Sequence, residues 1–325
     1  MKDVEMKMLQ RAKELLESGE VARVVGWKKG DFCFDPSPAT FETVEQLQDF
    51  VYDWFCGANL SKYLIQASKK EGKTAVFLKP CDTYSFNQLV KEHRINRENV
   101  YVIAVECLAK LDIEKIKAKG VTGVTGVEVD GKEVKVTSAY GTETLYKPDV
   151  VLTKCATCQK THQVKDEEII LHERPERDVN RFEEVEKLEA MTEDERFAYW
   201  KDQLSKCIRC NACRNVCPAC SCLKCVFDNP ASGIAAKAND SEFEEKLFHV
   251  IRAFHVAGRC TDCGECSRVC PQNIPLHLLN RKFIKDIDGM YGEYQAGETS
   301  EGKTPLTSYT EADTEPNDVF KGEAK

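Results

Sequence analysis

One cysteine motif occurs twice in this chain and limits its fold more than any other feature. The pattern Cys-x-x-Cys-x-x-Cys-x-x-x-Cys-Pro spans residues 207–218 and again residues 260–271. Three thiolates on one tight loop suit a 4Fe–4S cluster, and in proteins with two such clusters the fourth cysteine of each motif ligates the other cluster. The proline after each fourth cysteine fixes φ and has no N–H that needs a partner.

This crossover rule predicts two sets of ligands. Structural zinc sites usually combine two Cys-x-x-Cys pairs, and a disulfide framework requires export to an oxidising compartment, so both fit the pattern less well. Each predicted set takes three cysteines from one motif and the fourth from the other. Cluster 1 is predicted to bind Cys207, Cys210, Cys213 and Cys270, and cluster 2 to bind Cys260, Cys263, Cys266 and Cys217.

The composition limits the class of protein. A chain of 325 residues, 42% of them hydrophobic, is long enough for two domains or for one domain and a smaller module. A net charge of −8 argues against a nucleic-acid partner, because such binding depends on positive charge facing phosphates. No apolar run is long enough to span a membrane, and the charged first ten residues do not resemble a secretory signal. Seventeen cysteines without export predict metal ligation in a reducing cytoplasm, in an anaerobe.

Alternating helix and strand patterns predict an α/β domain with a mixed, largely parallel sheet in the first half of the chain. A β-rich stretch over 121–137 contains Asp130-Gly131, a typical hairpin turn. Helices are expected over 3–18, 43–55, 59–70, 83–92 and 111–119. Strands are expected over 21–27, 32–34, 74–79, 100–106 and 150–153.

The second half has a different character. Glu and Lys dominate up to the first cysteine motif, which is typical of a solvated helical connector, and a helix is expected over 241–256 between the motifs. The polar C-terminal stretch predicts a tail that is disordered or binds a partner. The expected units are an α/β domain over 1–165, the connector over 166–206, the cluster module over 207–288 and the tail over 289–325.

Four further cysteines lie at or just beyond the ends of predicted strands, and they are Cys81, Cys107, Cys155 and Cys158. Because the carboxyl ends of parallel strands open onto one crevice, these thiols are expected to meet. Four thiolates suit a third 4Fe–4S cluster or a structural zinc ion. Buried core cysteines and a redox-active Cys-x-x-Cys pair are the remaining interpretations.

Other polar and thiol groups flank these sites. Lys79 and Asp82 lie on either side of Cys81, where they would face a flavin or a cluster, or form an ordinary solvated pair. Cys220, Cys222 and Cys225 follow the first motif directly. We expect these three thiols to lie beside a cluster without binding it, and a further metal site is the alternative.

Several of these motifs resemble known families. Lys79-Pro80-Cys81, Glu106-Cys107 and the Cys-x-x-Cys at 155–158 resemble the beta subunits of deazaflavin-reducing hydrogenases and formate dehydrogenases. Together with Cys-Pro-Ala-Cys-Ser-Cys at 217–222, they also resemble sulfhydrogenase beta subunits, anaerobic sulfite reductase A subunits and flavin oxidoreductase subunits coupled to heterodisulfide reductase. The link over 218–259 and the stretch 258–279 are similar to the α-helical ferredoxin domains of respiratory and heterodisulfide-type reductases.

The resemblance, over about residues 74–275, implies that an α/β domain with a cubane beside a flavin precedes an α-helical dicluster ferredoxin domain. FAD is therefore a candidate cofactor. No strand–turn–helix pattern surrounds the glycines at 120, 123, 126 and 131, so they predict turns better than a phosphate cradle.

Iron–sulfur clusters pass electrons, so the chain is expected to be an electron-transfer subunit of a cytoplasmic, anaerobic multisubunit oxidoreductase. It would relay single electrons between a flavin- or nicotinamide-handling partner and a hydrogenase, formate dehydrogenase or heterodisulfide-reductase-like, bifurcating subunit. A ferredoxin or a flavoprotein is also a candidate partner. No catalytic residue is predicted, because the chain has no nucleophile triad, H-E-x-x-H or P-loop. The alternatives are a flavoprotein that exchanges hydride for electrons at FAD in the first domain, and a zinc-braced scaffold.

Overall fold

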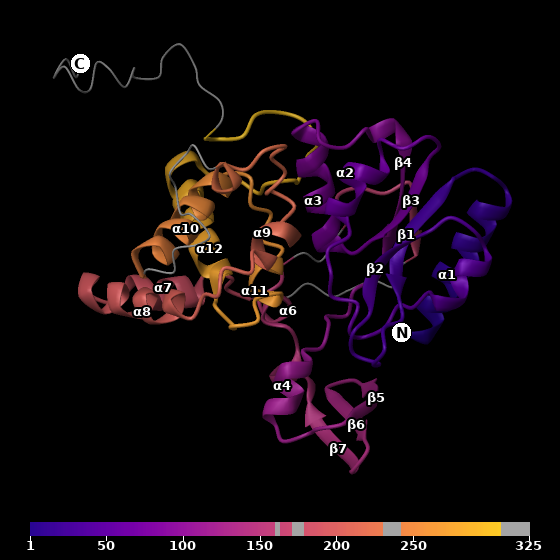
Figure 1. Cartoon of the computed structure of the whole chain (residues 1–325), viewed down its shortest axis with the longest axis horizontal. Helices are drawn as coiled ribbons and strands as arrows, with labels where there is room; N and C mark the ends of the chain where they lie inside the picture. The colour runs from indigo at the N-terminus through magenta and orange to yellow at the C-terminus, as the bar shows by residue number, and fades with distance from the viewer. Residues whose placement is uncertain (160–162, 171–178, 230–241, 307–325) are drawn as a thin grey trace.

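The computed structural model describes residues 1–159, 163–170, 179–229 and 242–306. An α/β domain and a group of helices lie side by side, and a small separate sheet lies below their junction in the view of Figure 1. None of the helices in these described ranges is long and apolar enough to cross a membrane.

The main sheet has five strands in the order β2-β1-β3-β4-β8. Strands β1, β3, β4 and β8 are parallel, and β2 is an antiparallel edge strand, which confirms the predicted mixed, largely parallel sheet. All residues of β3 are buried, as expected for a strand covered on both faces. The strands are β1 (Arg23–Lys28), β2 (Ser37–Phe41), β3 (Thr74–Leu78), β4 (Val100–Val105) and β8 (Glu168–Ile170).

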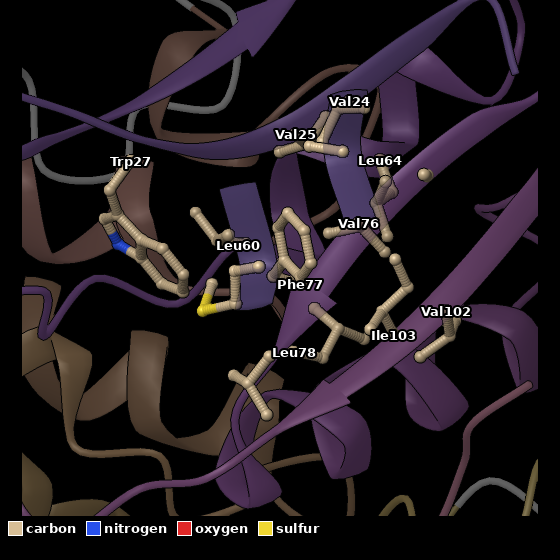
Figure 2. Packing of buried hydrophobic residues seen from close by; sticks show 14 of the residues in the cluster. Val24, Val25, Trp27, Leu60, Leu64, Val76, Phe77, Leu78, Val102 and Ile103 are labelled. Atoms are coloured by element: carbon tan, nitrogen blue, oxygen red, sulfur yellow. The ribbon is translucent and has the colours of Figure 1, made fainter. Parts of the chain in front are cut away.

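Helices α1 (Lys2–Glu17) and α3 (Pro80–Lys91) lie on either side of this sheet (Figure 1). The buried residues of α1 recur every three or four positions, so one stripe of the helix faces the strands. Trp27 and Phe77 are among the fully buried side chains of this core (Figure 2). Burying an apolar side chain of that size contributes roughly 1.5–3 kcal/mol. The core therefore holds the carboxyl ends of β3 and β4 in place, where two of the predicted ligands follow.

Two of the expected helices are wrong or too long. Over 43–55 only the 3₁₀ helix η1 (Glu45–Asp49) forms, because Phe50 bridges to the end of β1 and the Val51 N–H donates to Trp27 O at 3.0 Å. The expected helix over 59–70 is reduced to η2 (Ser61–Tyr63) and α2 (Leu64–Ala67).

The strand expected over 32–34 is also wrong. Those residues form a turn in which the Asp35 carboxylate accepts from the Phe32 N–H at 2.9 Å. The strand is β2, which includes Pro38. Proline is tolerated there because β2 is at the edge of the sheet.

The strand expected over 150–153 is replaced by two short helices, α5 (Lys147–Val150) and α6 (Thr153–Ala156). Pro148 at the start of α5 favours a helical turn. Only one isolated bridge, between Leu111 and Val151, remains of the expected strand pairing.

A second, antiparallel sheet packs with α4 (Ile113–Ala118) around its own apolar cluster. The predicted hairpin turn is confirmed, because Asp130 pairs with Glu133 across a turn in which Gly131 has a φ of +54°. The third strand was not predicted. The strands are β5 (Val124–Asp130), β6 (Glu133–Ser138) and β7 (Gly141–Tyr146).

After residue 166 the described secondary structure is helical, except for β8, which lies within the expected connector and joins the main sheet. The expected helix between the cysteine motifs is confirmed as α10. The helices are α7 (Glu183–Glu189), α8 (Glu193–Ser205), α9 (Ala212–Val216), α10 (Glu242–Val256), α11 (Glu265–Arg268) and α12 (Leu276–Tyr291). Short 3₁₀ turns are η3 (Arg97–Asn99) and η4 (Val226–Asp228).

Part of the expected tail is ordered against the α/β domain. Asn87 on α3 donates to the Glu298 carbonyl at 3.3 Å. Gly297 approaches the Tyr84 carbonyl so closely that a Cβ there would lie 1.9 Å from its oxygen. The rest of the tail, residues 307–325, lies outside the described residues.

Candidate metal centres

The two cysteine motifs fold along the same backbone path. In the first loop Arg209 and Asn211 have φ values of +54° and +61°, and in the second loop Asp262 and Gly264 have +56° and +66°. The left-handed region is costly for residues other than glycine, so its repetition at matching positions is a property of the motif and not of one side chain. In both loops a short helix, α9 or α11, then begins, and the third cysteine is its second residue.

The fourth cysteine of each motif lies beside the other motif. Cys270 shares an apolar cluster with Cys207 and Cys213. Cys217 shares a second apolar cluster with Cys260. Cys266, which the crossover rule assigns to the other set, also belongs to the first apolar cluster, and neither apolar cluster includes Cys210 or Cys263. The two fourth cysteines thus lie where the crossover rule expects them, and the complete ligand sets stay a prediction.

A buried arginine lies among these thiols. Arg252 on α10 is 2% exposed, and its guanidinium donates to the Cys213 carbonyl at 3.3 Å. Burial lowers the pKa of Arg252, but the thiols of Cys217 and Cys266 outweigh that effect and raise it. A buried cation needs negative charge nearby, and a thiolate-ligated iron–sulfur cluster supplies it. This side chain therefore fits a site that holds anionic clusters.

Hydrogen-bond donors also reach two of the predicted ligand sulfurs. His249 Nε2 lies 3.2 Å from Cys207 Sγ, and the Arg209 N–H donates to the same sulfur at 3.4 Å. Asn280 Nδ2 lies 3.7 Å from Cys266 Sγ. Such contacts orient a ligand and tune the cluster that it binds.

The four other predicted ligands line one small cavity, at the edge where β3 and β4 end. Three lysines complete its wall, and Asp262 and Cys263 of the second motif also border it. The cavity is therefore shared between the two halves of the chain. Its cysteines are Cys81, Cys107, Cys155 and Cys158, and its lysines are Lys79, Lys110 and Lys154.

Local structure explains how Cys81 reaches this cavity. Lys79 is the N-cap of α3, Pro80 begins the helix, and the Asp82 carboxylate accepts from the Lys79 N–H at 3.4 Å. Lys79 Nζ also pairs with Asp82 at 2.8 Å, with both side chains almost fully buried. Burial and the neighbouring Asp82 carboxylate raise the pKa of the Cys81 thiol. The Lys79–Asp82 pair is thus a buried ion pair beside the cavity, not a solvated one.

Lys110 is the cavity lysine that lacks a carboxylate partner among the described residues. It is 1% exposed, donates to the Asp53 carbonyl at 2.6 Å and lies 3.8 Å from the centre of the Tyr52 ring. Burial lowers its pKa, and the nearby Cys107 thiol opposes that effect. A buried ammonium in this position fits a cavity that holds a negatively charged group.

Glu265 joins the cavity to the helical half of the chain. Its carboxylate is fully buried and accepts from Lys154 Nζ, from the Arg268 guanidinium through two bonds of 2.8 Å, and from the Asn59 N–H at 3.1 Å. Burial would raise the pKa of Glu265, but Arg268 and Lys154 hold it well below its usual value. Lys154 also donates to the Gly57 carbonyl at 2.7 Å within the first half. Its pairing with Glu265, and that of the Asn59 N–H, hold the two halves together beside the cavity.

Of the three thiols after the first motif, Cys220 lies beside a predicted ligand of the second cluster. The Cys220 N–H donates to the Cys217 carbonyl at 3.1 Å. A hydrogen bond from the Cys220 thiol lowers the pKa of Cys217 to about 5. Cys222 is exposed and Cys225 is half-buried. Cys220 is therefore the one of the three in contact with a predicted ligand.

Two further observations concern the kind of cofactor. In the described ranges, no three Cys, His, Asp or Glu side chains are close enough to share one metal ion. A 4Fe–4S cluster does not require three side chains around one ion, because each of its four thiolates binds a different iron atom. The glycines between 120 and 131 serve the small sheet: Gly126 lies in β5 and Gly131 in the hairpin turn, so this stretch is not a phosphate cradle.

Sequence reasoning missed most of the polar residues around the thiols. They come from distant parts of the chain, and no local motif marks them. A sequence signal did exist for His249 and Arg252: they lie three residues apart and interrupt the apolar face of a helix. The missed residues are Lys110, Lys154, His249, Arg252 and Glu265.

Comparison with known proteins places this geometry in a class. A family model described as a 4Fe–4S dicluster domain matches residues 203–274. A protein of Sinorhizobium fredii named "Putative ferredoxin-3" is 34% identical over 79 residues, which cover 24% of this chain and 75% of that protein. Through these residues the chain belongs to the 4Fe–4S dicluster family, and it is an iron–sulfur electron-transfer protein.

The similarity to one relative extends over most of the chain, and a second relative matches part of it. The "F420-dependent formate dehydrogenase subunit beta" of Methanocaldococcus jannaschii is 22% identical over 85% of this chain and 88% of its own length. The "F420-dependent formate dehydrogenase 1 subunit beta" of Methanococcus maripaludis is 33% identical over 95 residues, which are 29% of this chain and 24% of that protein. The resemblance to formate dehydrogenase beta subunits, expected from the cysteine motifs, is confirmed.

Among solved structures, a chain of the F420-reducing [NiFe] hydrogenase complex from Methanosarcina barkeri covers 48% of this chain and 63% of its own length. Its identity is 14% and its TM-score is 0.36, a level of similarity on which we base no argument.

Proposed function

We propose that the chain is the electron-transfer subunit of a formate dehydrogenase-like complex and carries three 4Fe–4S clusters. Clusters 1 and 2 take the crossed ligand sets predicted from the sequence. Cluster 3 takes Cys81, Cys107, Cys155 and Cys158. When bound, the clusters supply one-electron redox chemistry. The chain holds them, keeps water from the inner ones and sets their charge environment.

One observation carries this proposal. The cavity lined by the four cysteines of cluster 3 is also bordered by Cys263, a predicted ligand of cluster 2. The three ligand sets therefore adjoin one another, from the interior of the α/β domain to the surface of the helical half. At the outer end Cys210 is exposed, whereas Cys107 and Cys155 at the inner end are buried. Such a series suits transfer of electrons between buried cluster 3 and a partner protein that docks over cluster 1.

The test is the iron, sulfide, zinc and flavin content of protein purified without oxygen. Three cubanes predict about 12 iron atoms per chain, falling toward about 8 in a Cys81→Ala/Cys155→Ala variant. Cys33→Ala is the matched control, because that half-buried cysteine lies outside every proposed ligand set. Unchanged iron in the double variant, or zinc lost in its place, would overturn the assignment of cluster 3.

The partner subunits and the cellular compartment are part of the same proposal. The two relatives named as formate dehydrogenase beta subunits favour a formate dehydrogenase-like partner over the hydrogenase and heterodisulfide-reductase alternatives. A flavin- or deazaflavin-handling subunit would exchange electrons with the other end, and electron bifurcation would require that subunit. Exposed cysteine ligands suit the reducing cytoplasm of an anaerobe. Co-purification of the tagged chain with a formate dehydrogenase catalytic subunit tests the choice of partner.

A second candidate function is that the chain itself binds the flavin. A cavity of about 700 Å³ lies between α4 and α6 on one side and α11 and the start of α12 on the other, and it borders Cys270. That size is within the range of about 300–1,000 Å³ usual for cofactor sites. Lys115, Arg268 and His277 supply polar groups to its wall. Stoichiometric FAD in the same analysis would favour this reading, and iron without flavin would leave the chain as a relay.

A further inference from the structure

Helix α10 buries two polar side chains, His249 and Arg252, against the cysteine motifs. His249 is 1% exposed, and its Nε2 lies 3.2 Å from Cys207 Sγ. Its other ring nitrogen, Nδ1, is buried and has no hydrogen-bond partner among the described residues. The imidazole therefore has one polar contact, and that contact is a predicted ligand of cluster 1.

The chemistry of a ligand sulfur settles the direction of this hydrogen bond. A thiolate bound to iron carries no proton, so the imidazole must donate from Nε2 and the cysteine must accept. An imidazolium would place a second N–H at the buried Nδ1, where the described residues offer no acceptor. The neutral ring with its proton on Nε2 is the form that satisfies both ends.

Cluster 2 has other side-chain donors among the described residues, and each is weaker. The Asn280 amide lies 3.7 Å from Cys266 Sγ, and the Cys220 thiol, a weak donor, bonds to Cys217. Arg252 lies among cysteines of both sets, so its charge acts on both clusters. In the described ranges His249 therefore makes the shortest side-chain N–H contact to a predicted ligand sulfur, and that sulfur belongs to cluster 1.

We propose that His249 is a positioning residue that raises the reduction potential of cluster 1 relative to that of cluster 2. Adding an electron increases the negative charge on the ligand sulfurs, so an N–H donor favours the reduced form. An electron that leaves cluster 2 oxidises it and reduces cluster 1, which is the cluster with the exposed ligand. The proposal rests on the ligand sets given under the proposed function.

The test compares variants by redox titration of anaerobically purified protein, with each cluster followed by electron paramagnetic resonance. His249→Phe keeps the ring shape and removes the donor. We expect its cluster 1 to have a reduced-to-oxidised ratio about threefold to tenfold lower at a given potential, where tenfold is 59 mV for one electron. His249→Gln can place an amide N–H near the same sulfur and should restore most of the shift. His255→Phe, an exposed histidine on the same helix, should change neither cluster.

Two results would overturn the proposal. One is an unchanged cluster 1 potential in His249→Phe. The other is an equal shift of clusters 1 and 2, which would indicate a general structural effect. If His249→Phe fails to assemble cluster 1, pulsed paramagnetic resonance of the unsubstituted protein decides the question. Protein labelled with ¹⁵N-histidine must then show a nitrogen coupling to reduced cluster 1, and no coupling would refute the contact.

The iron count separates this test from that of the proposed function. About 8 iron atoms in the unsubstituted protein, or unchanged iron in the Cys81→Ala/Cys155→Ala variant, would refute the three-cluster assignment and leave the comparison of clusters 1 and 2 intact. A protein with no iron at residues 207–270 would refute both. Normal iron with unshifted potentials would refute the role of His249 alone.

Discussion

Replacing Glu265 with glutamine should destabilise the contact between the two halves of the chain. Glutamine keeps a carbonyl oxygen for the Asn59 N–H, so the main loss is the negative charge between Lys154 and Arg268. The Arg268 side chain is 25% exposed and can turn to water. The Lys154 side chain is 6% exposed and cannot. The expected loss in the free energy of unfolding is therefore that of burying the Lys154 ammonium without its carboxylate partner.

The size of this loss follows from the single unpaired charge. Removing one partner of a buried ion pair costs about 3–5 kcal/mol. For a chain of 325 residues that unfolds in one transition, this corresponds to a fall in melting temperature of about 4–7 °C. The assay is thermal unfolding of the cluster-loaded protein without oxygen, followed by circular dichroism. Limited proteolysis at residues near the contact provides a second measurement.

Two further variants make the reasoning refutable. Lys154→Met together with Glu265→Gln removes both charges, so the double variant should be more stable than Glu265→Gln alone. Glu184→Gln, in an exposed ion pair with Lys187, should not change the melting temperature measurably. A double variant no more stable than the single one, or a single variant as stable as the unsubstituted protein, would show that the buried charges do not hold the halves together.

Three other substitutions follow from the same sites. Gly264→Ala should lower the free energy of unfolding by more than about 2 kcal/mol, because its φ is +66° and the new Cβ would lie 2.4 Å from a lysine Cβ. Gly292→Ala has a positive φ but open space, so it should cost only the backbone strain of about 1 kcal/mol. Melting curves of the two variants compare these losses. Lys110→Met should lower the reduction potential of cluster 3 and raise the melting temperature of iron-free protein, since it removes a buried cation; a lower melting temperature would contradict this. Cys222→Ser should leave iron content and potentials unchanged, whereas Cys220→Ser should shift the cluster 2 potential without loss of iron, as redox titration would show.

The candidate metal sites could be predicted where the proposed ligands lie at short spacing along the chain. The two motifs place three cysteines each on one loop, and that geometry is local. The cavity at the end of β3 and β4 was predicted for a partly wrong reason. Cys155 reaches it from the short helix α6 and not from a strand end. The expectation still led to the right place because β3 and β4, two almost entirely buried strands, set the edge at which the thiols gather.

What could not be predicted depends on contacts between distant segments. Residues 50 and 51 carry an apolar pattern that suits a helix, but they extend because the end of β1 offers backbone partners. Lys110, Lys154 and Glu265 are ordinary charged residues in the sequence. Their importance arises only when the two halves meet and bury all three. Local propensity and spacing carry no information about such an encounter.

The crossed position of the fourth cysteines has a consequence for the order of synthesis. Under the proposed ligand sets, Cys207, Cys210 and Cys213 leave the ribosome long before Cys270, and cluster 1 has only three permanent thiolates until then. Cluster 2 likewise needs Cys217 from the earlier segment. Cluster 2 cannot be completed before Cys266 is synthesised, and cluster 1 cannot be completed before Cys270. A polypeptide truncated before the second motif would therefore lack both centres, so complete metallation reports that translation has passed this motif.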